Sequence, residues 1–123
     1  MQFPRICLLL AALLPPAVLA QAPQPAVAVS PAEQEDLQFE DAIRDFGYVS
    51  GAARQCLPEA SRAAHDRESL KAFSGLVRLF GSDRAFYYAA AFGAGTSVVP
   101  DPAKCPTYLA DYKAAMKSRA INR

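Results

Sequence analysis

Residues 30–58 read SPAEQEDLQFEDAIRDFGYVSGAARQCLP, and this stretch decides the fold. Ser30 and Glu33 form the Ser-x-x-Glu pattern of a helix capping box, and Pro31 suits the first helical position. Pro58 indicates the end of the helix, because the residue before a proline disfavours helical geometry. The stretch therefore predicts one long helix, on which apolar residues recur with the period of one helix face: Phe39, Ala42, Ile43, Phe46, Val49, Ala53 and Leu57.

Similar apolar spacing downstream predicts a second and a fourth helix. The second helix covers about residues 59–80, and the sequence leaves open a break near His65 and Asp66. Gly81 is well placed to stop this helix. The fourth helix has Pro106 at its start, and its apolar stripe consists of Leu109, Tyr112, Met116 and Ala120.

The third predicted helix is apolar on nearly all sides. It has Ser82 or Asp83 as its cap and continues to Phe92. The Gly-Ala-Gly run at residues 93–95 is expected to end it, and residues 96–104 are expected to form a surface loop with two prolines. Because a helix that is hydrophobic all round is normally buried, we expect this one to be central and mostly buried.

The remaining sequence contains no strong alternation of apolar and polar residues of the kind that predicts a strand. Four helices without strands predict an all-α fold. We expect a small four-helix domain, orthogonal or bundle-like, with one disulfide and an N-terminal signal peptide before it.

Two cysteines, Cys56 and Cys105, lie in the predicted domain, and the third, Cys7, lies in the apolar N-terminal segment. An even number of cysteines in an exported chain favours a disulfide, because that compartment is oxidising. The alternatives are two free buried thiols or an intermolecular bridge. The expected bridge ties the end of the first helix to the start of the fourth.

The N-terminus has the features of a signal peptide: a positive charge at Arg5, a short apolar stretch, two prolines and a small-residue cleavage site ending at Ala20. The apolar stretch is shorter than the roughly 20 residues that cross a bilayer, although a membrane anchor or a buried helix is the alternative. We expect residues 1–20 to be removed, residues 21–31 to form a flexible proline-rich leader, and residues 32–123 to form the helical domain. The mature protein is then periplasmic or secreted, without stable membrane insertion.

The net charge of the predicted mature domain argues against nucleic acid as a partner. The chain has 13 basic and 12 acidic residues, and the loss of Arg5 with the signal peptide leaves equal numbers. A neutral domain lacks the basic surface expected of a nucleic-acid-binding protein. The charges are nevertheless segregated, because residues 33–45 are mainly acidic and residues 104–123 mainly basic. These segments would attract each other if they packed side by side. Each also complements the helix dipole, because the acidic residues lie early in the first helix and the basic residues lie late in the last one.

No metal site or cofactor is expected. A single histidine, His65, and two cysteines that pair with each other leave no cluster with zinc spacing. The acidic residues 33–45 lack the calcium-loop pattern and its glycine. The sequence has no Cys-x-x-Cys-His run for haem attachment.

Catalytic residues are not predicted either. There is no Gly-x-Ser-x-Gly elbow, and the neighbours of His65 (Asp66, Ser61 and Ser69) are those that any lone histidine acquires by chance. Four acidic residues of the first predicted helix could supply a pair of carboxylates for glycoside chemistry, but a solvated acidic helix end explains these residues equally well. They are Glu35, Asp36, Glu40 and Asp41.

The candidate partner-binding residues lie on and after the third helix. Tyrosines are common interface anchors, because a large apolar ring carries one polar tip. Loops held by a rigid scaffold are also common binding elements, although a glycine helix stop explains the Gly-Ala-Gly-Thr-Ser run without any function. The candidates are Tyr87, Tyr88, Gly95, Thr96 and Ser97.

The architecture resembles several classes of small exported helical proteins with a disulfide: periplasmic immunity proteins that block toxins, acid-stress chaperones, and pilotins of secretion systems. The resemblance rests on an exported helical domain with Cys56 and Cys105 far apart, and it covers no diagnostic motif. The expected function is a non-enzymatic periplasmic protein that binds another protein, as an inhibitor or immunity protein. The alternatives are a chaperone or envelope-stress factor, a secretion accessory protein, and a small hydrolase that uses His65.

Overall fold

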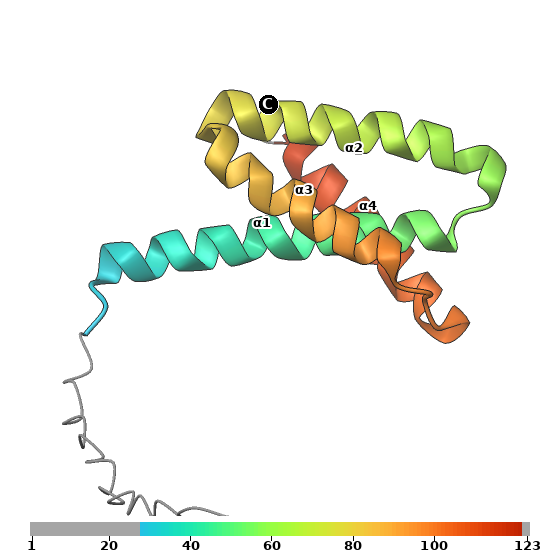
Figure 1. Ribbon diagram of the computed structural model, residues 1–123, viewed down its shortest axis with the longest axis horizontal. Helices are drawn as coiled ribbons and strands as arrows, with labels where there is room; N and C mark the ends of the chain where they lie inside the picture. The colour runs from blue at the N-terminus through green and yellow to red at the C-terminus, as the bar shows by residue number, and fades with distance from the viewer. Residues whose placement is uncertain (1–27, 122–123) are drawn as a thin grey trace, which may run out of the picture.

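A computed structural model describes residues 28–121, of which residues 28–118 have described side chains. Within this range the chain forms four α-helices and one short 3-10 helix, and it forms no strand (Figure 1). The predicted all-α fold is confirmed. The predicted signal peptide and cleavage site lie outside the described residues. The elements are α1 (Pro31–Cys56), α2 (Glu59–Phe80), α3 (Ser82–Ser97), η1 (Pro102–Lys104) and α4 (Cys105–Ile121).

The first helix begins and ends where its local signals predict. The Glu33 N–H donates to Ser30 Oγ at 3.3 Å, and the Ser30 N–H donates to the Glu33 carboxylate at 2.8 Å, so the capping box is complete. These bonds also lower the pKa of the Glu33 carboxyl group below its ordinary value. At the other end Leu57 is extended before Pro58, which confirms the predicted stop.

The second helix is continuous, and its end confirms the predicted glycine stop. No break occurs at His65, because this residue is buried and its ring nitrogen Nε2 donates to the Ser50 carbonyl of α1 at 2.9 Å. At the far end Gly81 has a φ of 86°, a left-handed conformation that glycine adopts without steric cost. A single residue therefore separates α2 from α3.

The third helix corrects three predictions. Its cap is Gly81 rather than Ser82 or Asp83, and it continues through the Gly-Ala-Gly run to Ser97. The last turn persists because tertiary contacts override the glycines: Gly95 is buried against α1, and the Ser97 hydroxyl donates to the Gly93 carbonyl at 2.8 Å. The expected loop is correspondingly shorter, and part of it forms η1.

The third helix is also less buried than its composition predicts. Phe86 is 66% exposed, and the fully buried residues of α3 are Ala85, Tyr88 and Gly95. The reason is geometric, because α1 covers one side of α3 and α2 diverges from it after the turn at Gly81 (Figure 1). An apolar helix can therefore lie at the surface when its neighbours leave part of it uncovered.

The central helix of the domain is α1, which packs closely against α3 and also contacts α4. Its backbone approaches that of α3 where glycines face each other, and a Cβ atom at Gly95 would lie 2.8 Å from the Ala52 nitrogen. The second helix packs on α3 and has little contact with α1. The buried apolar core lies between these helices and consists of Ile43, Phe46, Ala53, Leu76, Ala85, Tyr88 and Tyr112.

The disulfide joins Cys56, the last residue of α1, to Cys105, the first residue of α4. The two Cα atoms are 5.4 Å apart. The predicted pairing and the elements that it connects are therefore confirmed. None of the helices in the described range has the length and hydropathy needed to cross a membrane.

The acidic first half of α1 extends past the rest of the domain (Figure 1). Residues 31–38 are all exposed. Asp36 pairs with Arg84 of α3 at 2.9 Å, and Arg44 pairs with Glu40 and Asp41 of its own helix. Among the described residues no ion pair joins this acidic segment to α4, so the structure does not show the pairing of the two segments that the sequence left open.

Candidate functional site

The candidate site is a cleft between α2 and α3, with a volume of about 600 Å³. It exists because the two helices diverge from their turn at Gly81 (Figure 1). Helical spacing of three or four residues brings the lining side chains to one face of each helix. From α1 comes Arg54; from α2 come Asp66, Ser69, Leu70 and Phe73; from α3 come Tyr88, Ala89, Phe92 and Thr96.

The walls of the cleft are mainly apolar. Phe73 and Phe92 are partly buried against the core, whereas Leu70 is 63% exposed. The small Ala89 lies among these larger side chains and leaves space that none of the described residues fills. Apolar walls with a few polar groups are typical of sites that bind ligands or partner side chains.

Three side-chain hydroxyl groups of the described residues are buried and form no hydrogen bond of ordinary geometry: Ser50 Oγ of α1, Ser69 Oγ of α2 and Tyr88 Oη of α3. Ser69 is 5% exposed and Tyr88 is 2% exposed. A buried hydroxyl that forms no hydrogen bond costs about 1–3 kcal/mol. Ser69 and Tyr88 both interact with the Tyr112 side chain of α4, so their hydroxyl groups lie toward the core and not in the open space of the cleft.

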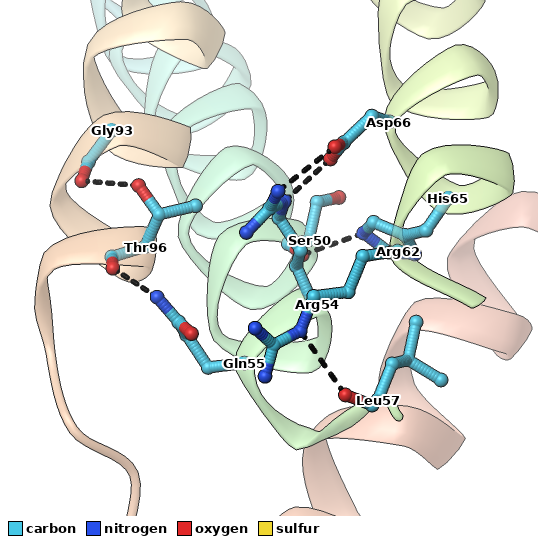
Figure 2. A network of polar contacts seen from close by, with 9 residues as sticks. All are labelled: Ser50, Arg54, Gln55, Leu57, Arg62, His65, Asp66, Gly93 and Thr96. Atoms are coloured by element: carbon cyan, nitrogen blue, oxygen red, sulfur yellow. Dashed lines mark hydrogen bonds and ion pairs between the residues drawn. The ribbon is translucent and has the colours of Figure 1, made fainter. Parts of the chain in front are cut away.

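An ion pair forms the polar side of the cleft (Figure 2). Arg54 of α1 contacts both carboxylate oxygens of Asp66 of α2, at 2.6 and 3.0 Å. The hydrogen bonds from Arg54 hold the pKa of the Asp66 carboxyl group below its ordinary value. The pair is formally neutral, and it links α2 to α1 where the backbones of these helices have little contact.

A hydrogen-bond network surrounds this ion pair and connects three helices (Figure 2). The Gln55 side-chain amide donates to the Thr96 carbonyl of α3, and Arg62 of α2 donates to the Leu57 carbonyl at 3.2 Å. Behind the cleft the His65 ring lies 4.4 Å from the Tyr112 ring, centre to centre. Polar contacts therefore anchor the N-terminal half of α2.

The fourth helix supports the back of α2 through Tyr112. Its hydroxyl donates to the Glu68 carboxylate of α2 at 3.2 Å. Burial, together with the negative charge of Glu68, raises the pKa of Tyr112 above its ordinary value. Tyr112 is therefore a neutral hydrogen-bond donor at neutral pH.

Asp66→Asn is expected to lower the free energy of unfolding by at most about 1 kcal/mol at neutral pH, because the pair is partly exposed to water. The pKa of Asp66 is lowered in the folded state, so its contribution is present above the ordinary carboxylate value of about 4 and is lost as pH falls through the lowered value. Urea denaturation should therefore show a difference from the parent protein at neutral pH that disappears in acid. Asp111→Asn on the exposed face of α4 is the control, and an equal effect of both substitutions would contradict the assignment.

The sequence-predicted binding residues do not all lie at one surface. Tyr88 and Thr96 line the cleft, whereas Gly95 is buried against α1. Tyr87 is half-buried, with the Arg44 guanidinium carbon 4.1 Å from its ring centre. Ser97 is exposed, and its hydroxyl is bonded to its own helix. The structure therefore brings together two of the five candidates.

The other residues of the cleft were not predicted as a site: they come from α1 and α2, and two of them, Ala89 and Phe92, come from α3. Leu70 and Phe73 belong to an apolar helix stripe, which by itself indicates only packing. Arg54 and Asp66 are 12 positions apart and carry no local signal for an ion pair. No sequence signal could reveal a cleft that depends on the angle between two helices.

The remaining candidates from the sequence are a metal site, His65 and the carboxylates considered for glycoside chemistry. The described residues contain no group of three or more His, Cys, Asp or Glu side chains that could hold a metal ion. His65 is buried and bonded to a backbone carbonyl. Asp36 and Asp41, two of the four carboxylates considered for glycoside chemistry, are exposed and paired with arginines.

Comparison with known proteins gives no relative: no protein-family model matches this chain, and no curated protein or solved structure is significantly similar to it. Neither fold similarity nor shared sequence therefore indicates an activity. The physical features available for a functional conclusion are the cleft and the exposed apolar side chains at its edge and beside it.

Proposed function

We propose that this chain is an exported, non-enzymatic binding protein that holds an apolar part of a protein partner in the cleft between α2 and α3. Its action is to inhibit or neutralise that partner. The observation that carries the proposal is the open apolar cleft with Leu70 exposed at its edge. An exposed apolar side chain beside a concave apolar surface is typical of interaction sites.

The surface beside the cleft favours a protein over a small molecule as the partner. Val77 lies on the same face of α2 as Leu70 and Phe73, at helical spacing, and it is exposed. On α3, exposed Phe86 lies one turn before Ala89 of the cleft. The apolar surface therefore continues along the hairpin beyond the cleft, which suits a macromolecule better than a compact ligand.

The disulfide supports the exported location in this proposal. Disulfides persist in oxidising compartments and are rare in the cytosol. The bridge between Cys56 and Cys105 fixes α4 against the end of α1, and Tyr112 of α4 in turn contacts α2. A rigid frame of this kind lowers the entropy cost of presenting a binding surface.

Leu70→Asp is expected to weaken binding of a hydrophobic dye such as bis-ANS by about tenfold or more, because it removes a leucine side chain from the contact and adds a charge. Leu79→Asp is the matched control: Leu79 is on the same helix and 68% exposed, but it does not line the cleft. Fluorescence titration of the two variants provides the test. Equal dye binding by both would contradict the proposal that the cleft is the binding surface.

The class of partner is tested by photo-cross-linking in the exported compartment, with benzophenone-alanine at position 70 and, as the control, at position 79. One protein cross-linked at 70 and not at 79 supports an inhibitor or immunity protein. Many unrelated proteins at position 70 would support the second candidate, a chaperone or secretion accessory protein, which exposed Leu70, Val77 and Phe86 also favour. No protein specific to position 70 would overturn the proposed protein partner.

A further inference from the structure

We infer that the partner segment held in the cleft is an acidic amphipathic helix, whose apolar side chains enter the cleft and whose carboxylates face Arg67, Lys71 and Arg78 of α2. The inference rests on the proposed function and names the chemistry of the partner. Its basis is an apolar cleft that has basic side chains along one of its two walls and uncharged residues along the other. These three basic residues are called the basic row.

Helical spacing places the basic row beside the cleft. Its residues directly follow Asp66, Leu70 and Val77, of which the first two line the cleft and the third continues their face of α2. Consecutive residues of an α-helix point about 100° apart. The buried residues Ser69 and Leu76 precede Leu70 and Val77, so the core lies on one side of the cleft face and the basic row lies on its solvent side.

The basic row carries charge that the chain leaves unpaired. All three side chains are exposed, and among the described residues none of them takes part in an ion pair. Arg54 and Asp66, the charged residues inside the cleft, pair with each other. Glu68 lies nearby in the sequence, but its carboxylate accepts a hydrogen bond from Tyr112 of α4. The α2 wall therefore presents three positive charges to a partner.

The opposite wall, formed by α3, is uncharged. The sequence has no charged residue between Arg84 and the end of α3 at Ser97, and Arg84 itself pairs with Asp36. The exposed positions of α3 near the cleft, Phe86 and Ala89, are apolar. A partner should therefore be acidic on the flank that meets α2 and uncharged on the flank that meets α3. Nucleic acids and anionic membranes present charge over a whole surface, for which basic residues on both walls would be expected.

The backbone of the partner is expected to be helical. The described residues form no strand, so an extended segment would find no sheet edge to pair with. Its backbone N–H and C=O groups would lose water above apolar walls without gaining partners. A helix satisfies these groups internally, and amphipathic helices bind apolar grooves in this way. Residues 67–78 extend over about 16 Å of α2, which matches three turns of a partner helix.

The test uses the purified, disulfide-bonded protein and three fluorescein-labelled helical peptides of about 15 residues, or four turns. The peptides share one leucine stripe and differ on one flank, which carries glutamate, glutamine or lysine. At low salt, fluorescence anisotropy should show the glutamate peptide bound about tenfold more tightly than the glutamine peptide, the gain expected from three exposed ion pairs, and the lysine peptide bound most weakly. In about 1 M NaCl, where the Debye length is about 3 Å, the three peptides should bind alike.

Replacement of the whole basic row by glutamate should reverse this order of affinities. The matched control makes the same change in net charge at three exposed lysines that do not line the cleft: Lys104→Glu, Lys113→Glu and Lys117→Glu. The control variant should keep the order of the parent protein. Both triple variants are expected to remain folded, because every replaced side chain is exposed, and circular dichroism together with binding of the glutamine peptide checks this.

Several results would overturn the inference. They are equal binding of the three peptides by the parent protein at low salt, and an equal loss of the preference in both triple variants. Tighter binding of phosphatidylglycerol vesicles than of the glutamate peptide would assign the basic row to an anionic membrane. A dimer of the parent protein that dissociates when the basic row is replaced would assign it to a second copy of this chain. The proposed function itself is contradicted by a different result, namely peptide and dye binding that are insensitive to Leu70→Asp.

Discussion

Replacing both Cys56 and Cys105 by serine is expected to lower the free energy of unfolding by about 4 kcal/mol. The bridge closes a loop between residues 49 positions apart, and a loop of this length restricts the unfolded chain by about that amount in the chain-entropy model. A small domain has a net stability of about 5–15 kcal/mol, so the loss would be a large fraction of the total. Urea denaturation of the double variant and the parent protein measures it.

Reduction of the parent protein provides an independent control for the disulfide. The reduced protein should unfold at nearly the same urea concentration as the double serine variant, because both lack the same cross-link. Each single serine variant should match them when measured with the remaining thiol reduced. A loss below about 1 kcal/mol would show that α1 and α4 are held together without the bridge, and the contribution assigned to it here would be wrong.

Gly51→Ala is expected to destabilise the domain by about 3 kcal/mol, at the upper end of the usual range for overpacking. A Cβ atom at this position would overlap the Phe92 carbonyl oxygen and would lie 2.9 Å from the Thr96 nitrogen. Both are backbone atoms of α3, so no side-chain rotation can relieve the overlap. The two helices would have to separate along their closest contact.

Gly93→Ala is the matched control for this prediction. Gly93 is also helical, but a Cβ atom there would meet no atom within 4 Å beyond its chain neighbours and the nearby backbone of its own helix. Alanine is about 1 kcal/mol better than glycine inside a helix, so this variant should be more stable than the parent protein. Urea denaturation should therefore give effects of opposite sign, and similar effects would contradict the assigned contact between α1 and α3.

The features that the sequence predicted correctly depend on neighbouring residues. The capping box at Ser30, the proline at position 58 and the glycine at position 81 each act within one turn of a helix. Their geometry is therefore the same in any fold. The disulfide was predictable for a different reason: a domain with two cysteines has one possible internal pairing.

The predictions were wrong where contacts between helices determine the end of a helix or its burial. Residues 93–97 have a loop composition, yet they remain helical because Gly95 fits closely against α1. The third helix was expected to be mostly buried because it is apolar nearly all round, yet Phe86 is exposed because no helix in the described range covers it. Composition describes the surface of a helix, whereas burial depends on what packs against that surface.

The candidate site shows the same division. Tyr88 and Thr96 were selected from the sequence, but their partners across the cleft, Ser69 and Leu70, come from another helix. The burial of the Ser69 and Tyr88 hydroxyl groups could not be foreseen, because it depends on the full three-dimensional surroundings of both side chains. The same is true of the volume between α2 and α3.

The sequence by itself determined the helices with strong local caps, the all-α class and the pairing of Cys56 with Cys105. These follow from short-range hydrogen bonding, backbone sterics and the count of cysteines. The tertiary structure alone decided where α3 ends, which of its faces is covered, and that α2 diverges to leave a cleft. Those outcomes depend on how closely two helix surfaces can approach, which is a property of both surfaces together and of neither sequence segment alone.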